Sequence, residues 1–140
     1  MSNELSERCS VIEECYEYML AYAGQGVSGH GDGTIRDFLS RAAQALTGLE
    51  SAYAHAVEER GLTPAGPYAA FQTVLARDAR DSLVAVELVL AQPAISSQLI
   101  DNLNASIHLR ALLTDLFLID EILKGRLNQQ SPAGAAGSAN

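Results

Sequence analysis

The chain has 140 residues, of which 17 are acidic and 9 are basic, so its formal net charge is −8, and 48% of its residues are apolar. This length and composition favour one compact globular domain and leave little room for two. The acidic balance argues against nucleic-acid binding, because phosphate recognition needs a clustered basic face, and neither the scattered arginines nor Lys124 forms one.

The N-terminal sequence MSNELSERCS lacks the basic start and apolar run of a signal peptide. No stretch of about 18 residues is free of charge, which argues against a membrane span. Cys9 and Cys15 lie roughly 240° apart on a helix, so they cannot form a disulfide within it, and we interpret both as small core residues. We therefore expect a cytoplasmic protein without a membrane contact.

Four helical segments are expected in chain order, at 3–23, 34–60, 67–91 and 95–127. The glycine-rich stretch GQGVSGHGDG, Gly61 and Pro93 separate them, and in the first three segments apolar residues recur at spacings of three and four. No segment has the alternating pattern of a strand. Because short loops join the segments, the sequence predicts an all-α fold, an antiparallel four-helix bundle over residues 1–128. A disordered, low-complexity tail is expected over 129–140.

The fourth segment is apolar around most of its circumference between Ile107 and Leu123. A helix of this kind needs cover on more than one side. Three partner helices within the bundle could supply that cover, and a second copy of the chain is the other source. We expect a homodimer formed through this segment, and its candidate interface residues are Leu112, Leu116, Ile119 and Leu123.

The same segment carries a row of polar residues that we call the polar ridge: Asp101, Asn104, His108 and Asp115. On one continuous helix these four side chains project within roughly 60° of one another. One hypothesis is a binding or proton-transfer site in which His108 titrates and a carboxylate orients it. The other is a hydrogen-bonded row that sets the register between helices or protomers, and we favour it because buried polar groups need partners.

The sequence contains no complete set of catalytic residues, and no Glu-x-x-His spacing typical of ferritin-like metal sites. We expect no cofactor and no metal. The favoured function is a non-enzymatic, homo-oligomeric bundle that acts through protein–protein contacts as an adaptor, scaffold or assembly factor. The alternative is a degenerate ferritin-like bundle that binds a metal, haem or a small ligand in its interior, and a third hypothesis is a small enzyme built around His108.

Overall fold

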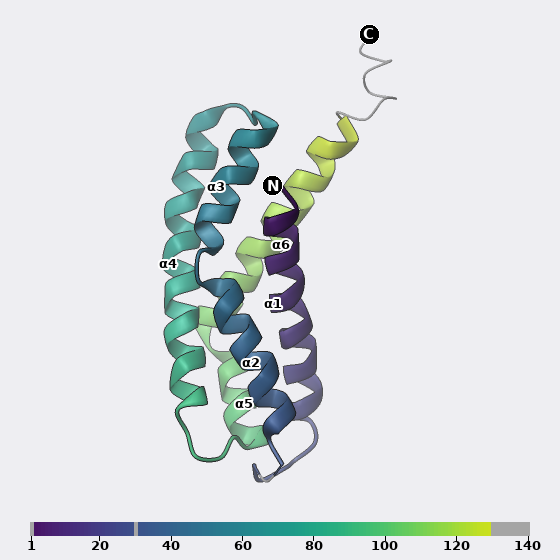
Figure 1. Ribbon diagram of the computed structural model, residues 1–140, viewed down its shortest axis with the longest axis vertical. Coiled ribbons are helices and arrows are strands. Elements are labelled where there is room, and N and C mark those ends of the chain that lie inside the picture. The colour runs from purple at the N-terminus through teal and green to yellow at the C-terminus, as the bar shows by residue number, and fades with distance from the viewer. Residues whose placement is uncertain (1, 30, 130–140) are drawn as a thin grey trace.

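The computed structural model describes residues 2–29 and 31–129 of the chain. These residues form helices and no strands (Figure 1), which confirms the all-α prediction for this part of the chain. Gln129, the first residue of the predicted tail, ends the last helix, and the rest of that tail lies outside the described residues. The helices are α1 (Ser2–Ala23), α2 (Gly33–Leu46), α3 (Leu49–Arg60), α4 (Ala65–Leu90), α5 (Ser97–Ala105) and α6 (Ile107–Gln129).

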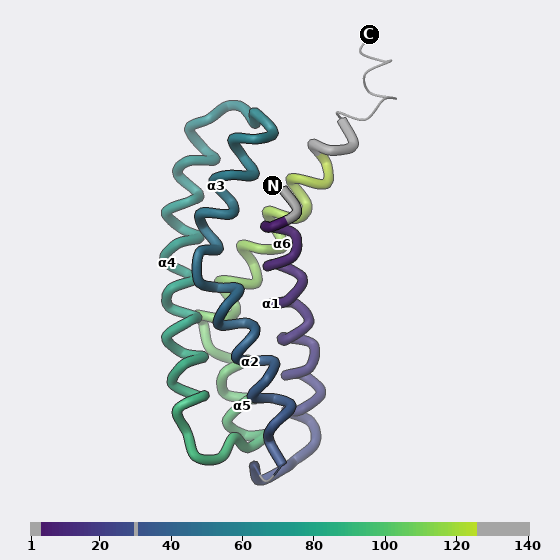
Figure 2. Tube along the Cα trace, in the orientation of Figure 1, coloured from purple at the N-terminus to yellow at the C-terminus, as the bar shows by residue number. Residues whose placement is uncertain are grey.

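The helices lie side by side with their axes roughly aligned, and some of them are joined end to end into longer segments (Figure 1). Helices α1 and α4 are continuous, whereas α3 follows α2 end to end and α6 follows α5 in the same way. The trace reverses direction after α1, after α3 and after α4 (Figure 2). Helix α1 packs against α2, α3 and α5, while α4 packs against α2, α3, α5 and α6. The predicted extents of the first and third segments differ from α1 and α4 by no more than two residues at either end.

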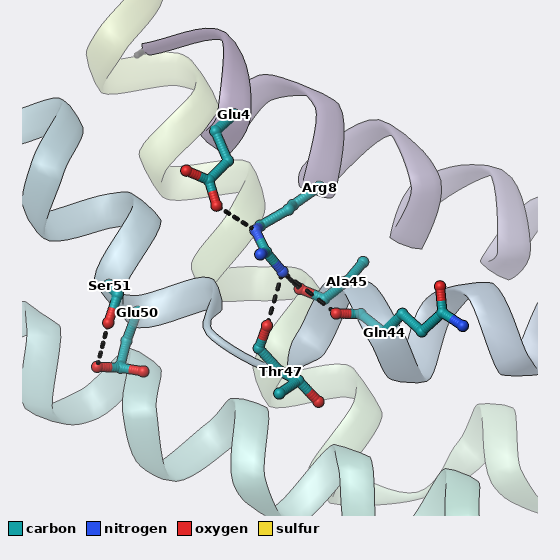
Figure 3. A network of polar contacts seen from close by, with 7 residues as sticks. All are labelled: Glu4, Arg8, Gln44, Ala45, Thr47, Glu50 and Ser51. Carbon is teal, nitrogen blue, oxygen red and sulfur yellow. Dashed lines mark hydrogen bonds and ion pairs between the residues drawn. The ribbon is translucent and has the colours of Figure 1, made fainter.

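The predicted helix over 34–60 is interrupted between α2 and α3. Gly48 has a φ of 87°, in the left-handed region that glycine adopts readily, and this conformation ends the continuous helix. Arg8 of α1 donates hydrogen bonds to the backbone oxygens of Gln44 at 3.2 Å, Ala45 at 2.9 Å and Thr47 at 2.7 Å (Figure 3). The arginine thereby satisfies carbonyls that the end of α2 leaves without helical partners.

The predicted helix over 95–127 is interrupted at Ser106, between α5 and α6. Ser106 has an extended backbone with a ψ of 146°, and its hydroxyl accepts a hydrogen bond from the backbone N–H of Leu109 at 3.3 Å. This is the geometry of a serine that caps the start of a helix, so α6 begins anew after Ser106. A constant rotation of 100° per residue cannot be carried through this junction, which changes the relative directions of side chains before and after it.

The core lies between the helices and receives apolar side chains from all six of them. Across the interface of α1 and α2, the ring of Tyr18 stacks on Phe38 with their centroids 4.5 Å apart. Within the described residues, no helix is both long enough and apolar enough to cross a membrane. Side chains with no exposed surface come from five successive helices, namely Leu39, Leu49, Leu75, Ile100 and Leu112.

Hydrogen bonds join the loop after α1 to the loop before α5 at the lower end of the molecule in Figure 1. The backbone N–H of Val27 donates to Ser97 Oγ, and the N–H of Ser97 donates to the Val27 oxygen, both at 3.0 Å. Ser97 Oγ in turn donates to the Tyr22 oxygen, and the Tyr22 hydroxyl donates to the Ile95 oxygen. Two loops that are distant in sequence are therefore held as one unit.

At the same end of the molecule, Arg36 is paired with Asp32 and binds the end of α4. Arg36 of α2 donates to the backbone oxygens of Leu90 at 3.0 Å and Gln92 at 2.6 Å, where α4 ends. Asp32 accepts from Arg36 Nε at 3.1 Å and from the Ile95 N–H at 3.0 Å. The hydrogen bond from Arg36 holds the pKa of Asp32 below its usual value. Arg36 thus caps the end of α4 much as Arg8 caps the end of α2.

Candidate functional site

The structure divides the predicted polar ridge between two helices. Asp101 and Asn104 lie on α5, whereas His108 and Asp115 lie on α6, beyond the junction at Ser106. Asp101 and His108 are exposed, which removes the apolar surroundings expected for the histidine. Asn104 is half-buried, and both polar atoms of its amide lack hydrogen-bond partners. The single-ridge interpretation is therefore wrong in its geometry, because it assumed one continuous helix.

Asp115 is the buried member of that set, and the structure pairs it with a residue that sequence reasoning did not select. It is 6% exposed, and its carboxyl group shares a hydrogen bond with that of Asp78 on α4. Burial raises the pKa of Asp115 to about 7, and the hydrogen bond and negative charge of Asp78 contribute to the increase. The second oxygen of Asp115, Oδ2, is buried without a partner. We call Asp78 and Asp115 the carboxyl pair.

The carboxyl pair bridges α4 and α6, and a second polar contact joins the same two helices nearby. One turn after Asp78, the hydroxyl of Ser82 donates to the backbone oxygen of His108 at 3.0 Å. A signal for Asp78 was present in the sequence, because it lies three residues after Leu75 and seven after Phe71, on the apolar stripe of α4. Its partner could not be read from that spacing, since only the register of α4 against α6 brings Asp115 opposite it.

The predicted interface residues belong mainly to the core of the chain itself. Leu112, Leu116 and Ile119 are buried within the monomer, and Leu123 is partly buried against the same core. Their spacing of four, three and four residues is that of a seam facing partner helices, and in this structure those partners are in the same chain. Among the side chains of α6 that the structure describes, the exposed large apolar ones are others, namely Ile107, Phe117, Leu118 and Ile122.

An apolar groove of about 330 Å³ lies between α6 and the pair formed by α3 and α4. On the α3–α4 side, the Tyr53 hydroxyl donates to the Tyr68 oxygen at 2.9 Å, and the Tyr53 ring meets Phe71 edge-on at 6.1 Å. On the α6 side, Leu118 and Ile122 stand at the rim and are 49% and 45% exposed. Among the side chains that the structure describes, no charged one lines the groove. Its lining residues are Tyr53, Pro64, Pro67, Tyr68, Phe71, Leu118, Ile119, Ile122 and Leu123.

A second, more polar groove of about 270 Å³ lies on the other side of α6, against α1. Glu13 of α1 and Asp120 of α6 both line it. Burial raises the pKa of Glu13, and the negative charges of Asp120 and Glu17 raise it further. The C-terminal half of α6 is therefore bordered by grooves on two sides, and Figure 1 shows this half leaning away from α3 and α4.

The two cysteines have the character of core residues. Burial raises the pKa of Cys9 to about 12, with further increases from Glu13 and Asp120. Burial also raises the pKa of Cys15 to about 12, partly offset by Arg41, and its thiol donates to Met19 Sδ at 3.6 Å. Because the thiolate is the reactive form, these side chains are poor nucleophiles at neutral pH.

Among the described residues, no group of three or more His, Cys, Asp and Glu side chains is placed to hold a metal ion. No protein-family profile matches the chain, and neither a curated protein nor a solved structure shows a significant match to it. Similarity to known proteins therefore indicates no function for this chain.

Proposed function

We propose that this chain is a non-enzymatic, homo-oligomeric helical protein that acts through protein–protein contacts, as an adaptor, scaffold or assembly factor in the cytoplasm. We interpret its helices as an antiparallel four-helix bundle in which two of the four long segments are interrupted. The observation that carries the proposal is the apolar groove, together with the half-exposed Leu118 and Ile122 at its rim. We call Leu118 and Ile122 the apolar strip.

A second copy of the chain is the occupant that we propose for the groove. In a two-fold dimer the same patch of surface meets itself, so the patch must combine a projection with a recess. The apolar strip is the projection and the groove beside it is the recess, so the strip of one copy can enter the groove of the other. The described residues that line the groove are uncharged, so they add no like-charge repulsion when two acidic chains meet there.

Residues 130–140 do not offer an alternative occupant. The sequence of residues 130–140, QSPAGAAGSAN, contains no large apolar side chain that could fill an apolar groove. Grooves of this kind commonly accept the apolar face of a helix, with side chains three or four residues apart as anchors. Leu118 and Ile122 have that spacing, which supports α6 of a second copy as the occupant.

The test is the molar mass of the purified protein by multi-angle light scattering. We expect the wild-type chain to be a dimer, and Leu118→Glu and Ile122→Glu to be folded monomers, because each variant places a charge in the contact without altering the core. The matched control is Leu88→Glu, since Leu88 is a 65% exposed leucine on α4 that does not line the groove. Substitution of buried Leu116 would not test the contact, because a buried charge would unfold the chain.

Two outcomes would overturn the proposal. One is a wild-type dimer whose mass is unchanged in folded Leu118→Glu and Ile122→Glu variants. The other is a monomeric wild-type chain that takes up a small apolar ligand, which would favour the ligand-binding alternative, since a recess of about 330 Å³ lies within the usual range for small-molecule sites.

A further inference from the structure

The carboxyl pair lies next to the apolar groove along both helices that it bridges. Asp78 follows Phe71, a lining residue of the groove, by two turns of α4, and Asp115 precedes Leu118 by three residues on α6. On the side of the pair away from the groove, Ser82 holds α4 to the start of α6. The pair therefore marks the place where α6 stops being held to α4 by polar contacts and begins to form one wall of the groove.

We propose that the carboxyl pair is a proton-dependent connection between α4 and α6 that regulates dimerisation, and that release of its shared proton favours docking of a second copy into the groove. This inference rests on the proposed function. With one proton present, the hydrogen bond between the two carboxyl groups draws α4 and α6 together. When the proton passes to solvent, two carboxylates face each other at a site where Asp115 is 6% exposed and its Oδ2 has no partner.

Separation of α6 from α4 relieves that repulsion, because it lets water reach the carboxylates. The same movement widens the groove, whose far wall is held by the Tyr53 and Phe71 contacts of α3 and α4. A wider groove admits the apolar strip of a second copy more readily. By linkage, dimerisation that releases a proton becomes tighter as the pH rises, and the raised pKa of Asp115 places this dependence near neutral pH.

The other charges around α6 lie across the second groove or at the surface. The second groove is lined by two acids, Glu13 of α1 and Asp120 of α6, and by two bases, Arg60 of α3 and Lys124 of α6, so its charges are mixed. Helix α5, which also packs against α6, carries the neutral Asn104 and the exposed Asp101. The charged or titratable side chains that flank the pair along its own helices are exposed, namely Arg77, Arg80 and Asp81 of α4 and His108 and Arg110 of α6.

The experiment measures the dimer dissociation constant by sedimentation velocity at pH 5.5 and pH 8. We expect the wild-type constant to fall by about tenfold or more at pH 8, which corresponds to at least 1.4 kcal/mol. In Asp115→Asn an uncharged amide can keep the hydrogen bond to Asp78, so we expect a constant that changes less than twofold. Asp78→Asn should lose most of the pH dependence too. His108→Gln is the matched control, because histidine is the other residue type that commonly changes charge in this range, and it should behave as the wild type.

A wild-type dimer whose dissociation constant is equal at both pH values, or an Asp115→Asn dimer with the same pH dependence as the wild type, would overturn the inference and leave the proposed function standing. A chain that is monomeric at both pH values would overturn the proposed function. In that case amide hydrogen exchange still tests the connection itself. After correction for intrinsic rates, α6 should exchange faster at pH 8 than at pH 5.5 in the wild type but not in Asp115→Asn. Equal corrected rates at the two pH values in the wild type would overturn the proton-dependent connection.

Discussion

At the lower end of the molecule, polar contacts tie the helices together, whereas at the upper end two grooves separate α6 from its neighbours. The loops at the lower end are joined through Tyr22, Val27 and Ser97, and Arg36 caps α4 there. At the upper end α6 borders its neighbours through an apolar groove on one side and, on the other, a groove with acidic and basic side chains. Under the proposed function, the lower end supplies the rigid part of the molecule and the C-terminal half of α6 supplies the contact surface.

The largest change in the free energy of unfolding is expected from a substitution at Gly29, at the lower end of the molecule. This residue has a φ of +115°, and an added Cβ would lie 2.9 Å from Ala94 Cβ and 3.1 Å from the Ile95 nitrogen. Gly29→Ala combines backbone strain with overpacking of the joined loops, and should lower the free energy of unfolding by about 3 kcal/mol. Urea denaturation measures the change.

The matched control for that variant is Gly31→Ala. Gly31 also has a positive φ, of +74°, but nothing lies within 4 Å of its would-be Cβ. Gly31→Ala should lower the free energy of unfolding only through backbone strain, by about 1 kcal/mol. Equal losses in the two variants would show that the close approach of the loops does not stabilise the lower end.

The next largest change is expected at the carboxyl pair, where the raised pKa of Asp115 makes the free energy of unfolding fall as the pH rises. The pKa of Asp115 is raised from 3.8 to about 7 in the folded chain, so the folded state binds more protons than the unfolded state between these values. The stability from this group is present below about pH 4 and is lost as the pH rises through about 7. Asp115→Asn should therefore be more stable than the wild type at pH 8, by on the order of 2 kcal/mol, and the difference should shrink towards pH 4.

Thermal unfolding between pH 4 and pH 8 measures this difference, with His108→Gln as the control. If the wild type were equally stable at both ends of the pH range, or if Asp115→Asn were the less stable protein at pH 8, the carboxyl pair would not be a source of strain between α4 and α6. Measurements at a concentration where the chain is monomeric keep the result separate from dimerisation.

The smallest effect is expected at the junction between the two ends. Arg8→Ala removes the donor to three backbone oxygens around Gly48, but the site is partly exposed and water can replace the side chain. The expected loss is about 1 kcal/mol. Faster amide exchange should accompany it at the end of α2. Arg77→Ala, at an exposed position of α4, should change stability by less than about 0.5 kcal/mol. A similar loss in both variants would contradict the capping role of Arg8.

Much of the helical content followed from local spacing, because a continuous apolar stripe requires a helix whatever covers it. That is why the predicted extents of α1 and α4 were close. The two interruptions were missed because a single Gly48 or Ser106 is tolerated within a helical pattern, and nothing nearby in sequence shows which one ends a helix. Arg8 of α1 supplies the partner that stabilises the first break, and the Ser106 hydroxyl competes for the backbone at the second.

The candidate site was less accessible from sequence than the helices were. The apolar excess of the fourth segment was visible, but Leu112, Leu116 and Ile119 turned out to face the other helices of the same chain, while Leu118 and Ile122 border the groove. A spacing of three and four residues identifies a covered face without identifying what covers it. Asp115 was selected in advance, whereas its partner Asp78 and the groove itself depend on how α4 and α6 pack against each other.

The sequence by itself determined an all-α, acidic chain, with helices bounded by glycines and prolines, because these properties depend on backbone conformation and side-chain periodicity over a few turns. Only the tertiary structure decided that Asp78 meets Asp115, that α6 is bordered by two grooves, and that the predicted interface residues are core residues. These features join elements distant in the chain, and their geometry depends on the register and tilt of packed helices, which no local pattern specifies.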